Sequence, residues 1–171
     1  MSTVIRAATV ADAGGIAGVY NYYILNSPAT FEEQAVDEAG MRARMSSGME
    51  HGYPWVVAEA AGRIVGYAYA GLWKARSAYR YSAEVSIYLD HESTAGGLGT
   101  RLYTVLFAEL RKRQVHILIG GITLPNPASQ ALHEKFGMKK VAHFERVGFK
   151  QNQWWDVGYW QMELVSESDL F

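Results

Sequence analysis

The sequence contains no cysteine among its 171 residues. Disulfide bonds, thiolate metal sites and a cysteine nucleophile are therefore excluded. Its five histidines show neither HxxxH nor HxH spacing, so we expect no metal site. Internal repeats, linkers and low-complexity stretches are also missing, and the length is typical of a single domain over residues 1–171.

A marked excess of charge is absent too. The formal net charge is −1, so no overall field attracts nucleic acid or an anionic membrane. No apolar run approaches the roughly 20 residues of a membrane-spanning helix. Arg6 and Asp12 interrupt the N-terminal segment where a signal peptide would have its apolar core. We therefore expect a cytoplasmic protein whose partners are neither nucleic acids nor membranes.

The composition is that of a folded globular protein, with 49% hydrophobic and 19% charged residues. Periodicity, turn residues and caps predict a mixed α/β domain. One helix should begin at a capping box formed by Thr9 and Asp12. Another should have Asn126 as its N-cap, Pro127 in its first turn and Gly137 after its end. The expected order is a strand at 2–8, helices over about 10–25 and 37–45, strands at 53–60, 63–73 and 82–90, a helix at 100–113, a strand at 115–122, a helix at 127–136 and two strands within 143–164.

The segment SAEVSIYLD, residues 82–90, has the period of a strand with two unlike faces. One face carries Glu84, Ser86 and Tyr88. The other face carries the apolar side chains of Ala83, Val85, Ile87 and Leu89.

The glycine-rich segment STAGGLGTRL, residues 93–102, lies between this strand and an amphipathic helix. Gly96, Gly97 and Gly99 would let a backbone come close to a ligand. The segment is not a P-loop, because no Lys-Ser or Lys-Thr pair follows Gly99. It is not a dinucleotide fingerprint, because Leu102 stands where the third glycine would be. A strand, a glycine turn and a helix N-terminus indicate an anion site, and a turn that only reverses the chain is the alternative.

Together with its neighbours, this segment resembles the loop that binds the coenzyme in the GCN5-related N-acetyltransferase (GNAT) family. Gly97-Leu98-Gly99 fills the G-x-G/A part of the signature Q/R-x-x-G-x-G/A, and GITLPNPASQALHEKFGM resembles the closing N…S/A…L-Y-E-K-L-G-F segment. AYAGLWKARSAYRYSAEVSIYL, GLGTRLYTVL and DVGYWQ resemble the phosphinothricin and methionine sulfoximine acetyltransferases. The resemblance covers Ile5 to about Leu164. It implies the acyl-CoA N-acyltransferase fold, a mixed, mostly antiparallel sheet flanked by helices, with acetyl-CoA as donor and an amine as acceptor.

The chain departs from the family pattern at two places. Thr94 stands where the family usually has Gln or Arg, and Ala95-Gly96 replaces the usual Gly-Lys/Arg. Backbone amides do not depend on those side chains, so we expect this change to affect coenzyme affinity rather than function. The second departure is His133, where many members have tyrosine and the phosphinothricin-type enzymes have histidine.

The reaction that the resemblance implies requires a base. An α-amino group has a pKa near 8 and must lose a proton before it attacks. We expect Glu84 to act through a water molecule, because a carboxylate is a weak base unless burial raises its pKa. His133, one turn after Ser129, would face the same cleft and give a proton to the departing thiolate or accept one from the amine. The alternatives are a structural glutamate and a core or capping histidine.

The resemblance also assigns the donor site. The backbone of residues 87–89 would hold the pantetheine arm as an added strand, and amides of residues 95–100 would bind the pyrophosphate. Asn126 and Ser129 would bond the pantetheine, with ordinary helix capping as the alternative. The expected donor-binding residues are Ile87, Tyr88, Leu89, Thr94, Ala95, Gly96, Gly97, Leu98, Gly99, Thr100, Asn126 and Ser129.

The acceptor site is expected around WKARSAYRY, residues 73–81. Cationic side chains beside aromatic rings suit a small amino acid with a carboxylate and a phosphinate or sulfoximine oxygen. A solvated loop is the alternative. The expected acceptor-binding residues are Lys74, Arg76, Tyr79, Glu84 and Ser86, and the resemblance adds Phe31, which is similar to the aromatic wall of the family's pocket.

The sequence therefore predicts an N-acetyltransferase for the α-amine of a small amino acid or analogue such as phosphinothricin or methionine sulfoximine. Acetylation of a protein N-terminus or lysine is the alternative among enzymes, and it calls for an open acidic or extended groove. A non-catalytic acyl-CoA sensor is the alternative outside them. The aromatic C-terminal strands and the habit of the family predict a homodimer.

Overall fold

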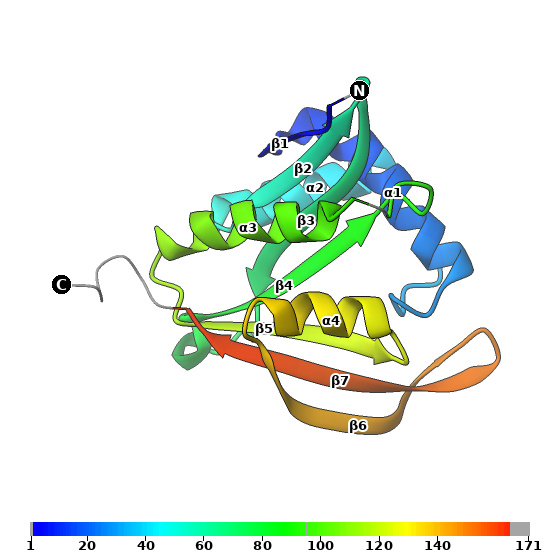
Figure 1. Cartoon of the computed structure of the whole chain (residues 1–171), viewed down its shortest axis with the longest axis vertical. Coiled ribbons are helices and arrows are strands. Elements are labelled where there is room, and N and C mark those ends of the chain that lie inside the picture. The colour runs from blue at the N-terminus through cyan, green and yellow to red at the C-terminus, as the bar shows by residue number, and fades with distance from the viewer. Residues whose placement is uncertain (1, 95, 165–171) are drawn as a thin grey trace.

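The computed structural model describes residues 2–94 and 96–164 (Figure 1). Their strands form one seven-stranded sheet in the order β1-β2-β3-β4-β5-β7-β6. The pair β4–β5 is parallel and the other neighbours are antiparallel, which confirms the mixed, mostly antiparallel sheet. The strands are β1 (Val4–Ala7), β2 (Trp55–Ala60), β3 (Arg63–Leu72), β4 (Ser82–Leu89), β5 (Ile117–Leu124), β6 (Lys139–Lys150) and β7 (Gln153–Glu163).

Helices cover both faces of the sheet. They are α1 (Ala13–Asn26), α2 (Glu38–Glu50), α3 (Leu98–Arg111) and α4 (Pro127–Lys135), with short 3₁₀ helices η1 (Val10–Asp12) and η2 (Ser77–Tyr79). Helices α1 and α2 lie on one face, and α3 and α4 lie on the other (Figure 1). Each face has its own apolar core, with Leu106 of α3 in one and Ile16 of α1 in the other. In the described part of the chain, no helix is both long and apolar enough to cross a membrane.

The local signals for the helices agree with the structure at their starts. The Thr9 N–H donates to the Asp12 carboxylate at 2.8 Å, and the Ser129 N–H donates to Asn126 Oδ1 at 3.1 Å. Helix α2 continues to Glu50 instead of ending near Met45. Met41, Met45 and Met49 recur every four residues and pack against α1 and the sheet, so burial of this stripe extends the helix.

Strands β4 and β5 pair only at their beginnings, where residues 82–84 face residues 117–119. The Asp90 N–H donates to the Val65 carbonyl at 2.9 Å. Bonded residues alternate along an antiparallel strand, so the even-numbered residues of β4 bond to β3. The odd-numbered residues therefore direct their N–H and C=O groups toward β5, into the gap that opens after residue 84. These residues are Val85, Ile87 and Leu89.

Candidate active site

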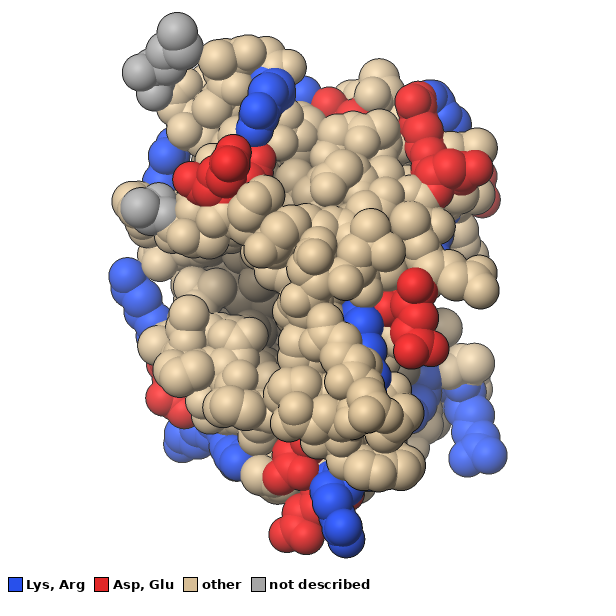
Figure 2. All heavy atoms as spheres, turned by 90° about the vertical axis from the view of Figure 1, so that its right-hand side faces the viewer, with Lys and Arg blue, Asp and Glu red and all other residues tan. Residues whose placement is uncertain are grey.

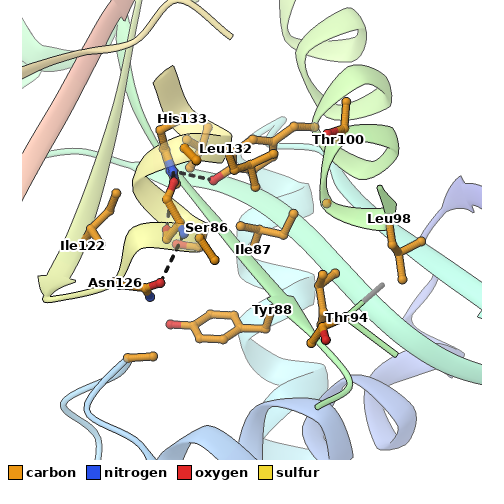
Figure 3. A pocket seen from close by; sticks show the side chains of 18 of the residues that line it. Ser86, Ile87, Tyr88, Thr94, Leu98, Thr100, Ile122, Asn126, Leu132 and His133 are labelled. Atoms are coloured by element: carbon orange, nitrogen blue, oxygen red, sulfur yellow. Dashed lines mark hydrogen bonds between the residues drawn. The ribbon is translucent and has the colours of Figure 1, made fainter. Parts of the chain in front are cut away.

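A cavity of about 490 Å³ opens where β4 and β5 separate. Figure 3 shows Ile87 and Tyr88 of β4 on one side, Asn126 and His133 across from them, and the start of α3 beyond. On the side of the molecule seen in Figure 2, the surface is hollowed and the walls of the hollow are mostly uncharged. The predicted donor-binding residues that line the cavity are Ile87, Tyr88, Leu89, Thr94, Gly97, Leu98, Gly99, Thr100, Asn126 and Ser129. Gly96 is described but does not line it, and Ala95 lies outside the described residues.

The glycine loop leads into the first turn of α3 and borders open space. Gly96 and Gly97 have φ values of +81° and +71°, a region that favours glycine. A Cβ atom at either position would meet no heavy atom within 4 Å, whereas one at Gly99 would lie 3.2 Å from Leu132. The free N–H groups and the positive end of the α3 dipole therefore face a volume that an anion could occupy.

Lys135 adds a cation beside this loop, which the sequence analysis did not identify. Its Nζ donates to Thr100 Oγ1 at 3.3 Å, and the residue lines the cavity. Thr94 brings no charge to the position where the family usually has Gln or Arg. A lysine in the last turn of a helix ordinarily interacts with the dipole of that helix, so its place in the sequence does not indicate this second role.

Glu84 lies on β4 two residues before Ser86, which does line the cavity. Burial raises the pKa of the Glu84 carboxyl, and the charge of Lys74 partly opposes this effect. A raised pKa makes the carboxylate a stronger base. Among the described residues Glu84 is not part of the cavity lining, but side chains two apart on a strand are only about 7 Å apart. That separation leaves room for a water molecule between Glu84 and the cavity.

His133 and Tyr103 are both buried and both line the cavity. Figure 3 shows His133 across the cavity from Ile87 and Tyr88. His133 Nδ1 lies 2.7 Å from the Ser129 carbonyl, which can only accept, so Nδ1 carries the proton. Nε2 then accepts from the Tyr103 hydroxyl at 3.0 Å. Burial lowers the pKa of His133 and raises that of Tyr103, so the histidine stays neutral and the hydroxyl stays protonated. The structural and the catalytic interpretations of His133 are both compatible with these bonds.

The predicted acceptor residues are not gathered at the cavity. Lys74 Nζ lies 4.9 Å above the Trp73 ring, close enough to Glu84 for its charge to act on that carboxylate. The side chains of the irregular segment 73–81 have no strand or helix period, so the sequence alone could not place them. Ser86 is the member of this set that lines the cavity. The other predicted residues, all within the described range 2–94, do not line it: Phe31, Lys74, Arg76, Tyr79 and Glu84.

Tyr23 and Ala29 also line the cavity, and they are among the lining residues that the sequence analysis missed. The Tyr23 hydroxyl donates to the Leu89 carbonyl at 2.6 Å, so this carbonyl of the gap already has a partner. Tyr20 and Tyr23 lie one turn apart in α1, a spacing typical of core packing. No local signal connects residue 23 with residue 89. Among the described residues, His, Asp and Glu form no group of three that could hold a metal ion.

A glycine loop at a helix N-terminus, beside two strands that separate, is the arrangement that the resemblance implies for a protein of the acyl-coenzyme A-binding class. The model of the acetyltransferase (GNAT) domain matches residues 5–158, and the chain belongs to this family.

Three relatives illustrate the range of activities named in the family. The chain is 34% identical over 165 residues to an L-methionine sulfoximine/L-methionine sulfone acetyltransferase of Pseudomonas aeruginosa, covering 96% of each chain. The solved phosphinothricin acetyltransferase of Sinorhizobium meliloti, in complex with acetyl-CoA, has a TM-score of 0.92 at 35% identity, covering 98% of this chain and 92% of that one. The ribosomal-protein-alanine N-acetyltransferase of Brucella melitensis has a TM-score of 0.91 at 35% identity, covering 94% and 99%.

Proposed function

We propose that the chain transfers the acetyl group of acetyl-CoA to the α-amine of a small amino acid or analogue of the phosphinothricin or methionine sulfoximine type. The observation that carries this proposal is the cavity between β4 and β5, with its backbone groups, its glycine loop and the nearby half-buried Glu84. The named activities of the Pseudomonas and Sinorhizobium relatives support the acceptor class, and the acetyl-CoA in the second of them supports the donor.

The residues around the cavity fit acetyl-CoA. The backbone of Val85 and Ile87 could pair with the amides of the pantetheine arm. The first turn of α3 and the Lys135 ammonium could hold the pyrophosphate, since the space beside Gly97 is open. Asn126 is the N-cap of α4 and leaves its amide N–H₂ for the pantetheine. Once bound, acetyl-CoA supplies an activated thioester carbonyl.

The residues of the chain then act on the two reacting groups, the acceptor ammonium and the departing thiolate. Glu84 accepts one from the acceptor ammonium through a water molecule, and its raised pKa suits this role. Tyr103, held by His133, places a protonated hydroxyl on the opposite wall. This hydroxyl can rotate from His133 Nε2 to hydrogen-bond a departing thiolate, which stabilises the developing negative charge.

For the acceptor, we assign recognition of the carboxylate to Lys74 and Arg76. Lys74 lies near Glu84, and the exposed side chain of Arg76 can bind a carboxylate bidentately. We assign three further residues to the walls of the acceptor site: Tyr79, Ser86 and Phe31.

A protein N-terminus is the second candidate acceptor, because the Brucella relative is named for acetylating a ribosomal-protein alanine. Release of free coenzyme A thiol from acetyl-CoA distinguishes the two. The acceptors to compare are phosphinothricin, methionine sulfoximine, methionine sulfone, the standard amino acids and a peptide that begins with alanine. We expect turnover with the small amino acids or analogues. Turnover with the peptide alone would overturn the proposal, and binding of acetyl-CoA without turnover of any acceptor would indicate a sensor.

We also propose a homodimer that uses the β6–β7 ribbon. Strand β6 is an edge strand of the sheet, and such edges are usually covered when they carry apolar side chains. Five large apolar side chains on this ribbon are more than half exposed: Val141, Phe144, Val147, Phe149 and Trp154.

A further inference from the structure

The segment between α1 and α2 forms one wall of the cavity without being a helix or strand. Ala29 lines the cavity, and Phe31, which we assign to the acceptor site, follows two residues later. In Figure 1 this segment lies close to the turn that joins β6 and β7. We call residues 27–33 the acceptor wall. Because this segment lacks the regular backbone hydrogen bonds of a helix or strand, contacts with other parts of the chain must fix its position.

Lys150, the last residue of β6, bonds the backbone of this wall. This residue is 3% exposed, and its Nζ donates to the carbonyls of Ser27 and Thr30 at 2.7 Å each. A third, longer bond of 3.3 Å reaches the carbonyl of Tyr23. The three N–H donors of the ammonium thus meet three carbonyls, as a buried cation requires. Burial lowers the pKa of Lys150, and the carboxylates of Glu32 and Glu33 oppose that shift.

Two of these carbonyls lie at the C-terminal end of α1: that of Tyr23, which also accepts from the Ser27 N–H at 3.1 Å, and that of the C-cap residue Ser27. The negative end of the helix dipole also favours a cation at this place. Lys150 therefore connects the end of α1 to the wall, across more than a hundred residues of sequence.

Gly148, two residues before Lys150 on the same strand, contacts the side chain of the wall. A Cβ atom at Gly148 would overlap the ring of Phe31. The absence of a side chain at Gly148 therefore leaves the space that the Phe31 ring occupies. Lys150 fixes the backbone of the wall, and Gly148 fixes the place of its aromatic ring.

The opposite side of the wall is held by charged and polar side chains. Arg44 of α2 binds both oxygens of the Glu32 carboxylate, at 2.6 and 2.8 Å. The hydroxyls of Tyr20 and Thr30 lie 2.8 Å apart, within hydrogen-bond distance. The Glu32 charge is therefore paired with Arg44, and both side chains of this pair are partly exposed.

We propose that Gly148 and Lys150 are positioning residues that hold the acceptor wall in place and thereby set which acceptor side chains the enzyme takes. The proposal rests on the proposed function, because it treats Phe31 as part of the acceptor site. It predicts that changes at the end of β6 alter the use of the acceptor much more than that of acetyl-CoA, because among the described residues 27–33 of the wall Ala29 is the one that lines the cavity.

The first test replaces Lys150 and, as a control, the exposed Lys139 of the same strand. Hydrogen exchange of the amides in residues 27–33 should be faster in Lys150→Met and unchanged in Lys139→Met. The KM for the best acceptor should rise about tenfold or more in Lys150→Met, because a wall displaced by about 1 Å costs binding of this order or larger. The KM for acetyl-CoA should stay close to that of the wild type in both variants.

The second test uses Gly148→Ala, which displaces the end of a side chain and so preserves the fold even if Lys150→Met does not. In Gly148→Ala the KM for the acceptor should rise, because the new methyl group displaces the Phe31 ring. In the double variant Gly148→Ala/Phe31→Leu this KM should return part of the way to the wild-type value, because leucine leaves room for the methyl group. Unchanged exchange of the wall in Lys150→Met, or an unchanged acceptor KM in Gly148→Ala, would overturn the proposal. A wild type that releases no thiol with any acceptor would contradict the proposed function instead, and hydrogen exchange would still decide whether Lys150 holds the wall.

Discussion

His133 is buried against Tyr103 and Ser129, and this burial lowers its pKa. A histidine in the unfolded chain has a pKa near 6.5, whereas His133 in the folded protein has a lower pKa and binds its proton only at lower pH. The folded state is therefore unaffected above pH 6.5 and loses stability as the pH falls below it, by at most about 1.4 kcal/mol per pH unit from this residue.

Urea unfolding at pH 7.5 and pH 5 measures this loss. We expect the wild type to lose more stability between the two pH values than His133→Gln, which has no proton to gain. Equal losses would show that His133 does not have the lowered pKa that the structure assigns to it.

Single residues differ in how well the sequence predicts them. Glu84 and Ser86 could be placed on one strand face because alternation is a local pattern, and Asn126 could be placed by its capping chemistry. The bonds of Tyr23 with Leu89, and of Lys150 with the end of α1, join segments far apart in the chain. No periodicity encodes such pairs, and only the fold shows them.

At the scale of elements, the glycine loop and the first turn of α3 form the proposed anion site. Gly97 has a φ of +71°, where a β-branched residue is strained by about 1–2 kcal/mol. Gly97→Val should shift the loop amides and weaken acetyl-CoA binding about tenfold or more.

Gly52→Val is the matched control, because Gly52 has a φ of +80° and equally open surroundings away from the cavity. Calorimetry should give a similar loss of stability in both variants but weaker acetyl-CoA binding only in Gly97→Val. Normal binding by Gly97→Val would show that this loop does not meet the coenzyme.

The order of elements was predictable because caps, turns and alternation are written within a few residues. The end of α2 was not, since tertiary packing of Met49 extends it. The separation of β4 from β5 is likewise a property of pairing between strands, with almost thirty residues between them. The family resemblance supplied the fold that local signals alone left open.

At the scale of the whole molecule, the gap between β4 and β5 connects the two faces of the sheet. Glu84 and Ser86 belong to the side of β4 that faces away from α3, whereas His133 and Tyr103 lie with α3 and α4. Donor and acceptor can therefore approach from different faces and meet in the gap. This arrangement suits the proposed direct transfer, with Glu84 as the proposed base on one side and the Tyr103 hydroxyl on the other.

The proposed dimer is also a property of the whole molecule. Trp154→Glu on the exposed ribbon should lower the mass in solution from that of two chains to that of one, because it places a charge in an apolar interface. Val4→Glu, equally exposed on the opposite edge strand β1, is the control and should leave the mass unchanged. Sedimentation velocity measures both, and a wild type with the mass of one chain would contradict the dimer.

The role of Glu84 as the base is the central claim, and the pH dependence of kcat/KM for thiol release tests it most directly. The rate should fall as the pH falls through the raised pKa of Glu84, above its ordinary value of 4.5, because the protonated carboxyl cannot accept a proton. In Glu84→Gln, kcat/KM should drop by about 10²–10⁴-fold and this acidic limb should disappear, with acetyl-CoA binding retained. A variant that keeps the wild-type rate and the acidic limb would contradict the claim.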